Sequence, residues 1–107
     1  MAYKVLAQSA PSAATATDVY TVGSGVETVI STIIIANRAA AAGTFRLSVR
    51  PNGGTQTNAM YCAYDVPVAA NDSTTLTLGL TMDATDVITV YCSSADMSIN
   101  IFGTEIS

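Results

Sequence analysis

The residues that could act on a substrate or a partner are few, and two arginines stand out among them. The 107-residue sequence has no histidine and only four lysine and arginine residues. Two of these, Arg46 and Arg50, lie in the stretch TFRLSVR, where Phe45, Leu47 and Val49 alternate with polar residues. Side chains of a strand alternate between its two faces, so the pattern predicts a strand with both arginines on its solvent side, about 13 Å apart.

Two interpretations of these arginines are open. In the first, each arginine pairs with a carboxylate of its own sheet or is simply solvated. In the second, the guanidinium groups reach carboxylates or carbonyls of a neighbouring subunit, because arginine is favoured at protein interfaces. Arg38, in the loop before this strand, is a candidate to join Arg46 and Arg50.

The sequence offers little material for catalysis. A serine or cysteine nucleophile needs a base that can hold a proton near pH 7, and histidine is absent. Asp83 and Asp86 are the closest carboxylate pair, but both flank a corner in MDATDV, where aspartate typically bonds to nearby backbone N–H groups. Asp65 and Asp72 bracket another turn, and a calcium site built from all four is an alternative that no DxDxDG loop supports. We therefore predict a protein that is not an enzyme and has no metal or cofactor.

Cys62 and Cys92 fall in different predicted strands. No CxxC motif accompanies them, and a zinc site would need histidines that the chain lacks. Two free, half-buried thiols are the favoured interpretation, and a disulfide between neighbouring strands is the alternative.

Two tyrosines of the segment from Ala59 to Asp65 are assigned to opposite faces of a strand. Tyr64 shares a face with Met60 and Cys62 and is expected in the core. Tyr61 lies on the other face and is the better candidate for contact with a partner.

The elements that must position these residues are predicted to be short strands. Valine, isoleucine and threonine are abundant, and turn residues recur every 8 to 14 residues or so, which indicates an all-β antiparallel sandwich, Ig-like or jelly-roll, with about eight strands and no long helix. We expect one domain, with an N-terminal strand and arm over 1–17 and the sandwich over 18–107. The run from Val26 to Asn37 predicts a central strand covered on both sides, and GSG before it predicts a hairpin turn. STTLTLGL predicts one strand with Leu76, Leu78 and Leu80 inward. MSINIFGTEI predicts the last strand, with Met97, Ile99 and Ile101 on one face.

Composition narrows the class of partner. Charged residues make up only 11% of the chain, so a surface of hydroxyl, amide and small apolar groups can be buried in an assembly at low cost. A net charge of −4 without a basic cluster disfavours nucleic acid and anionic membranes. No apolar run reaches the roughly 18 residues of a membrane span, and no secretory segment is recognisable, so we expect the protein to stay in a cytoplasm.

Several stretches carry a resemblance to a known group of proteins. TFRLSVRPNGG, AANDS, ATDVITVYCSS and the terminal INIFGTEIS, together with the opening YKVLAQSAPSA, resemble small single-domain β-rich virion proteins of tailed bacteriophages, including cyanophages. The likeness runs over nearly the whole chain, although these strings specify turns and strand faces rather than a site. Cys62 and Cys92 depart from it, since smaller or non-thiol residues are expected there.

The resemblance implies a structural subunit of a particle assembled in the host cytoplasm. The leading expectation is a capsid decoration or cement protein on the major capsid protein, and the alternative is an accessory protein of the tail or baseplate. It also implies a homo-oligomer, often a trimer, and carries over no catalytic residues. A carbohydrate-binding module is a further alternative, weakened by the absence of tryptophan. The candidate contact residues are the arm from Ala2 to Thr17 together with Tyr3, Val5, Arg38, Arg46, Arg50 and Tyr61.

Overall fold

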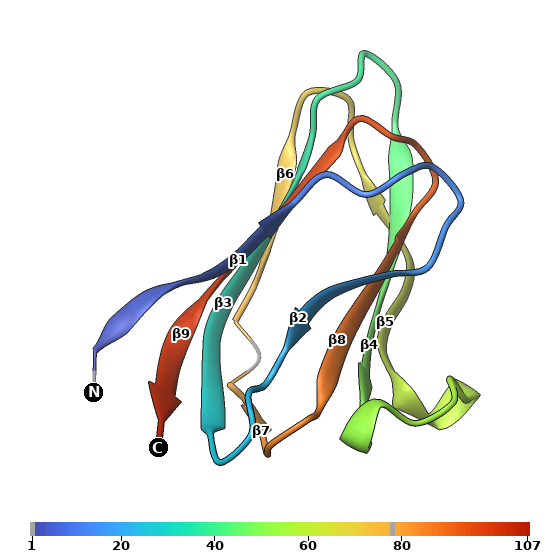
Figure 1. The fold of residues 1–107 in the computed structure, drawn as a ribbon. Helices are drawn as coiled ribbons and strands as arrows, with labels where there is room; N and C mark the ends of the chain where they lie inside the picture. Colours follow the sequence, from blue (N-terminus) through green and yellow to red (C-terminus); the bar gives the residue numbers. More distant parts are fainter. Residues whose placement is uncertain (1, 78) are drawn as a thin grey trace.

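A computed structural model describes residues 2–77 and 79–107 of the chain. Over these residues the chain forms nine strands and two short 3-10 turns, arranged as a sandwich of two layers (Figure 1). The all-β prediction is therefore confirmed. The elements are β1 (Tyr3–Ser9), β2 (Thr17–Thr21), β3 (Glu27–Asn37), β4 (Gly43–Arg50), η1 (Pro51–Gly53), η2 (Asn58–Met60), β5 (Tyr61–Val68), β6 (Ser73–Leu76), β7 (Leu80–Met82), β8 (Val87–Cys92) and β9 (Met97–Ile106).

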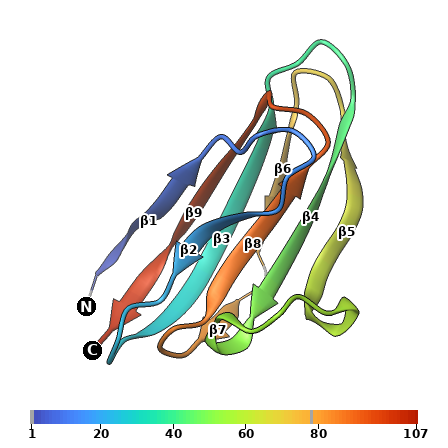
Figure 2. The same ribbon diagram turned by 45° about the vertical axis from the view of Figure 1, so that its right-hand side comes forward.

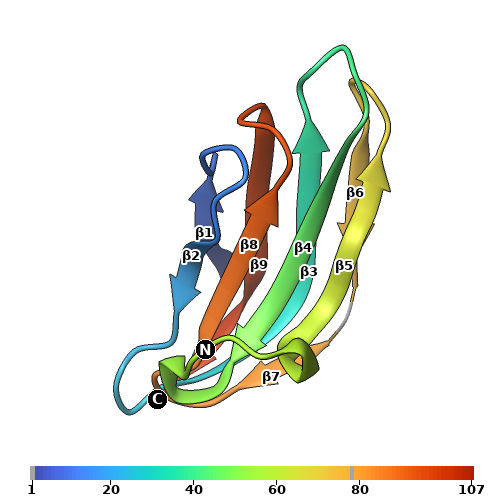
Figure 3. The same ribbon diagram turned by 90° about the vertical axis from the view of Figure 1, so that its right-hand side faces the viewer.

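The strands form two antiparallel sheets. Sheet A has the order β1-β9-β3-β6, with β7 also paired to β3, and sheet B has the order β2-β8-β4-β5. Figure 3 looks onto sheet B, with sheet A behind it. Because β6 and β7 pair along the same strand, they fill one strand position. Each strand of the first half then pairs with a strand of the second half: β1 with β9, β2 with β8, β3 with β6 and β7, and β4 with β5. This nested antiparallel pairing, folded into two sheets, is the topology of a jelly roll.

The core lies between the two sheets and follows the period-two pattern of the sequence. Sheet A contributes Ile30, Ile33, Ile35, Met97, Ile99 and Ile101, and sheet B contributes Phe45, Leu47, Ile88, Val90 and Cys92, all of them fully buried or nearly so. The predicted inward faces of β4 and β9 are thus confirmed. Burial of these side chains is the main force that holds the layers together.

Two strand predictions are corrected by this two-layer arrangement. β3 is central in its sheet, but only the face with Thr28, Ile30 and Ile33 is buried, because no third layer lies over its other face among the described residues. The segment STTLTLGL forms two strands, β6 and β7, with Gly79 at φ +61° between them. Leu76 and Leu80 pack against the core as predicted, and Leu78 lies outside the described residues.

Two connections also differ from the sequence-based expectation. The GSG turn does not close a hairpin, because it joins β2 of sheet B to β3 of sheet A (Figure 2). Residues 2–17 do not extend from the domain as an arm: β1 is the edge strand of sheet A, beside β9. The loop that follows is fixed by the buried Pro11 and by the Ala14 N–H, which donates to the Cys92 carbonyl at 2.8 Å.

Gly103 allows β9 to lie between β1 and β3. It pairs with Lys4 on one side and Ile30 on the other. The pairing with β3 shifts register directly beside Gly103, and the pairing with β1 shifts one residue further along β9. A Cβ at this position would overlap the carbonyl oxygen of Val29 and would lie 3.1 Å from both Ile30 Cα and Leu6 Cδ1. Backbone atoms of a central strand cannot move aside cheaply, so the position requires glycine.

We expect Gly103→Ala to lower the free energy of unfolding by about 3 kcal/mol, because the added methyl overpacks the junction of three strands. Urea denaturation followed by far-UV circular dichroism measures the change. Gly23→Ala is the matched control, since its Cβ would meet only Val26 Cγ2 at 3.6 Å. Equal losses for the two variants would contradict this account of Gly103.

Candidate interaction surface

The outward side of sheet B holds an arginine stacked between two tyrosine rings. Arg46 of β4 lies beside Tyr91 of β8 in the pairing register, and β5 flanks β4 on the other side. The Arg46 Cζ atom is 4.2 Å from the centre of the Tyr64 ring and 4.5 Å from the centre of the Tyr91 ring. Both distances are within the range of cation–π attraction. Three neighbouring strands thus converge on one guanidinium group.

Asp65 fixes the orientation of that guanidinium group. Arg46 Nε donates to Asp65 Oδ1 at 2.7 Å, and Nη2 donates to Oδ2 at 3.4 Å. The hydrogen bond to Asp65 raises the pKa of Arg46 above its ordinary value, so the group is permanently charged. The backbone of Asp65 has φ +50°, which is uncommon for a non-glycine residue and marks an irregular point in β5. We call Arg46, Asp65, Tyr61, Tyr64 and Tyr91 the arginine–tyrosine cluster.

Tyr61 and Tyr64 meet on this surface, contrary to their predicted separation. Their ring centres are 4.9 Å apart with an interplanar angle of 84°, an edge-to-face contact. Tyr64 is 56% exposed, so its predicted place in the core is wrong, while Tyr61 is half-buried. The pairing of β4 with β5 shifts register near Leu47, and such shifts break the strict alternation on which the prediction relied.

Arg50 also pairs within its own sheet. Its Nη2 donates to both carboxylate oxygens of Asp18 at 3.1 Å, and Nη1 donates to the Gly54 carbonyl at 3.3 Å. Asp18 Oδ1 additionally accepts a hydrogen bond from Thr89 Oγ1 at 3.0 Å. The first interpretation, in which Arg46 and Arg50 each pair with a carboxylate of their own sheet, is therefore confirmed.

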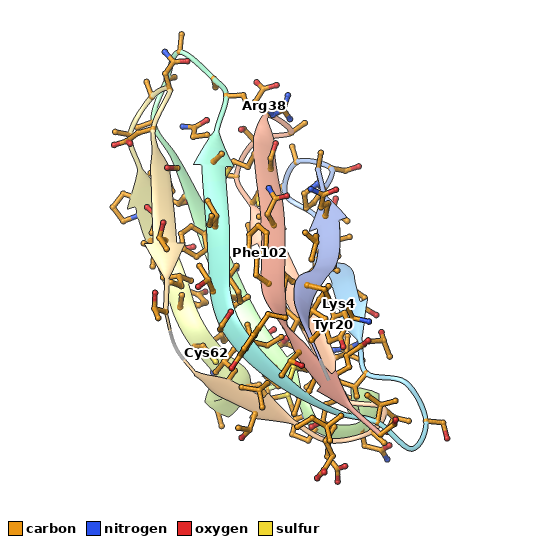
Figure 4. All side chains as sticks on the ribbon, turned by 90° about the vertical axis from the view of Figure 1, so that its left-hand side faces the viewer. Lys4, Tyr20, Arg38, Cys62 and Phe102 are labelled. Atoms are coloured by element: carbon orange, nitrogen blue, oxygen red, sulfur yellow. The ribbon has the colours of Figure 1, made fainter. Side chains whose placement is uncertain are left out.

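Arg38 does not join the other arginines. It follows the last residue of β3, at the end of sheet A, where Figure 4 shows it beside the end of β9. Its Nε donates to Ser98 Oγ at 2.9 Å and its Nη2 to the Ala95 carbonyl at 3.2 Å. The prediction that Arg38 could join Arg46 and Arg50 rested on its place in the loop before β4. The loop between β3 and β4, however, crosses from sheet A to sheet B, so it separates Arg38 from the arginines of β4 (Figure 2).

Tyr3 and Val5 lie far from the cluster in the fold. Both belong to β1, at the edge of sheet A, and their side chains are 81% and 50% exposed. The candidate contact residues named from the sequence therefore lie on two different broad faces of the sandwich. Tyr64 and Tyr91 belong to the cluster but were not among them, because their proximity to Arg46 depends on strand order.

Three of the four carboxylates considered for catalysis or calcium are engaged in turns, and Asp72 accepts the Ser73 N–H at 2.8 Å. Asp65 does not bracket a turn as expected, because β5 continues through it to Val68. Asp86 accepts the Asp83 N–H at 2.9 Å and the Asn52 N–H at 2.8 Å, and Asp83 accepts the Ala84 N–H at 2.8 Å. The predicted role of these residues in capping a corner is confirmed. Across residues 2–77 and 79–107, no group of three or more histidine, cysteine, aspartate or glutamate side chains could hold a metal ion.

The thiols and the buried tyrosine also lack the features of a reactive group. Cys62 on β5 and Cys92 on β8 are separated by β4, and both are free. Cys62 is exposed and Cys92 fully buried, so neither is half-buried as expected. Desolvation by the surrounding protein raises the pKa of both thiols, even though Cys62 is partly open to solvent, and this disfavours the thiolate. The Tyr20 hydroxyl donates to Glu105 Oε2 at 2.6 Å, and Lys4 Nζ lies 2.8 Å from Glu105 Oε1, closing one end of the sandwich (Figure 4).

Comparisons of the chain with protein-family models, with curated proteins and with solved structures find no match. Among the described residues no helix is long and apolar enough to cross a membrane. The arginine–tyrosine cluster combines an ion pair, two cation–π contacts and an aromatic pair on one surface. Its chemistry is that of contact: exposed aromatic area held rigidly beside a fixed positive charge.

Two buried acidic groups predict a loss of stability at alkaline pH. Burial raises the pKa of Cys92 from 9.0 to about 11, and burial together with the hydrogen bond to Glu105 raises that of Tyr20 from 10.0 to about 12. The folded state holds both protons more tightly than the unfolded chain does. The contribution to the free energy of unfolding is therefore fully present below pH 9.0 and is lost as pH rises from 9.0 to about 12.

Urea denaturation in reducing buffer, at pH values from about 8 to about 12, measures this slope. Cys92→Ala should remove the part of the slope that begins at pH 9.0, and Tyr20→Phe the part that begins at pH 10.0. Each variant also loses packing or hydrogen bonds, so slopes rather than absolute stabilities are compared. A slope unchanged in both variants would show that other groups titrate.

Proposed function

We propose that this chain is a non-enzymatic structural protein of a bacteriophage virion, and specifically a capsid decoration or cement protein that packs on the major capsid protein. The observation that carries the proposal is the arginine–tyrosine cluster. Tyrosine and arginine are the residue types that dominate the energetics of protein interfaces, and here they lie together on a rigid sheet. The resemblance of the sequence to small virion proteins supports the same class of function.

The electrostatics of sheet B support attachment to a large protein scaffold. Arg46 and Arg50 are already paired with Asp65 and Asp18, so a partner covering this face would meet no isolated charge. The stacked rings restrict the rotation of Arg46 before any partner binds. Less conformational entropy is then lost on association, and many weak copies on one shell can stabilise it by mass action.

The experiment compares virions that carry the protein with virions depleted of it. We expect depleted particles to lose infectivity faster on heating and at altered salt. Restoring the protein as Tyr64→Ala should lower its occupancy on particles by about tenfold or more, because the substitution removes the most exposed ring of the cluster. Ser24→Ala, at an exposed position in the turn between β2 and β3, is the control and should bind normally. Unchanged heat and salt resistance of depleted virions would refute the cement role.

Location on the particle separates the two structural alternatives. Density for the chain over joints between capsid subunits would agree with a cement protein. Density on the tail or baseplate, seen by electron microscopy of intact particles, would replace it with an accessory tail component. Either outcome retains a non-enzymatic structural role.

A second candidate function is carbohydrate binding, favoured by one observation. Three tyrosines gather on the outward side of sheet B, beside a small hollow lined by Ser48, Gln56 and Thr89 among others. Sugars stack on exposed aromatic faces and bond to hydroxyl and amide groups. However, one face of Tyr64 and one face of Tyr91 are already covered by Arg46, which leaves less ring area for a pyranose.

Glycan-array screening of the purified protein tests this second candidate. Under the leading proposal no glycan is retained, because the rings are occupied by Arg46 and by each other. Retention of a glycan by the unmodified protein, lost in Tyr91→Ala but kept in Tyr3→Ala, would favour the carbohydrate-binding module instead. Tyr3 is the matched control, since it is an exposed tyrosine on the other sheet.

A further inference from the structure

The outward side of sheet A is a broad surface without charged side chains in the body of its strands. Pairing across the sheet aligns its outward residues in rows, and together they define what we call the neutral face. The rows are Tyr3, Thr104, Val29 and Thr81; Val5, Phe102 and Thr32; Gln8, Asn100, Ile34 and Thr75; and Ser98, Ala36 and Ser73. Figure 4 looks onto this face, with Phe102 near its middle and no other described segment in front of it.

Exposed apolar side chains are concentrated at one end of this face. Among the described residues the large hydrophobic side chains with the greatest exposure are Tyr3, Val5, Tyr64 and Ile106, and only Tyr64 lies on sheet B. Ile106 continues the neutral face at the end of β9, where it pairs with Glu27. Clustered apolar exposure of this kind marks a surface that is normally covered.

The charges nearest to the neutral face lie at its edges. Lys4 and Glu105 pair with each other on the inner side of the sheet edge, at 2.8 Å. Glu27, the first residue of β3, pairs with Ile106 and borders the face at one end. Arg38, whose Nε donates to Ser98 Oγ at 2.9 Å, borders it at the other end. A partner placed on the neutral face would therefore bury hydroxyl, amide and apolar groups, whose desolvation cost is small compared with that of an ion.

We propose that a second copy of this chain packs on the neutral face, with the two faces in contact across a two-fold axis. In a two-fold contact residue i of one copy meets residue j of the other and residue j meets residue i, so every charge on the surface must find its complement at one fixed position. The neutral face has no such requirement in the body of its strands, whereas the ion pairs of sheet B, Arg46 with Asp65 and Arg50 with Asp18, would have to be desolvated together with their partners. A surface without charges in the body of its strands fits an identical neutral surface better than a strongly charged partner, so a second copy is the favoured occupant.

The dimensions of the molecule are sufficient for such a dimer. The domain measures 41 × 30 × 19 Å along its principal axes, so it is a slab with two broad faces. A stable dimer buries about 800 Å² on each subunit, which is within the extent of one broad face. Packing through sheet A would leave the arginine–tyrosine cluster of each copy free on the opposite sides of the dimer. The inference concerns self-association alone and holds or fails separately from attachment to a particle.

Sedimentation equilibrium of the purified full chain, at concentrations from about 1 to about 100 µM, tests the proposal. We expect a species of two chains. Val5→Lys should raise the dissociation constant at least about tenfold, because an ammonium group would be buried without a partner. Tyr64→Lys, which introduces the same charge at a similarly exposed position on sheet B, should leave the dimer intact.

Gln8→Lys provides a second variant in case Val5→Lys perturbs the edge strand. It adds a charge at an exposed position of the neutral face and should weaken the dimer in the same direction. Circular dichroism checks that each variant is folded. A chain that stays monomeric over the whole range, a trimer, or a dimer broken by Tyr64→Lys but not by Val5→Lys and Gln8→Lys would overturn the inference. A monomer that still binds particles would leave the proposed function standing.

Discussion

The position of the last strand between the first and the third is the constraint on which this fold depends. β9 pairs with both β1 and β3, and β8 pairs with both β2 and β4, so neither sheet is complete until nearly the whole chain is present. Pairing strands that are distant along the sequence costs conformational entropy, and burial of the apolar faces between the sheets must offset that cost. The position of β9 also explains the requirement for Gly103, whose missing side chain lets three backbones approach close to the register shifts on both sides. The completed sheets form a slab whose two broad faces hold their side chains in fixed positions.

The distribution of charge over this slab is more informative than the total. Each ion pair of the structure, Lys4 with Glu105, Arg46 with Asp65 and Arg50 with Asp18, cancels within itself. The net charge of −4 therefore comes from residues at turns and strand ends. These residues are Glu27, Arg38, Asp72, Asp83, Asp86 and Asp96. Negative charge on the rims can keep the protein in solution while both broad faces remain inexpensive to cover, an arrangement suited to assembly.

Local pattern was enough to predict the strands but not their partners. Alternation in β4 and β9 predicted which side chains enter the core, and the turn chemistry of Asp83 and Asp86 predicted their capping role. Strand order decides that Tyr91 faces Arg46, and irregular pairing decides that Tyr64 is exposed. Neither is a property of a short segment. The same limit applies to Arg38, whose position depends on the path of a loop between layers rather than on its distance along the sequence.

Internal pairing of the arginines does not remove the surface around Arg46 from contact with a neighbour. Among the described residues the side-chain hydrogen bonds of Arg46 go to Asp65 through Nε and Nη2, while its Cζ lies over the rings of Tyr64 and Tyr91. Internal pairing therefore immobilises Arg46 without hiding Tyr64, which is still 56% exposed. A flexible arginine would lose rotamer freedom on meeting a partner, and an unpaired one would lose its hydration. Arg46 has already lost both during folding, so a partner on this surface would meet mainly the aromatic area around it.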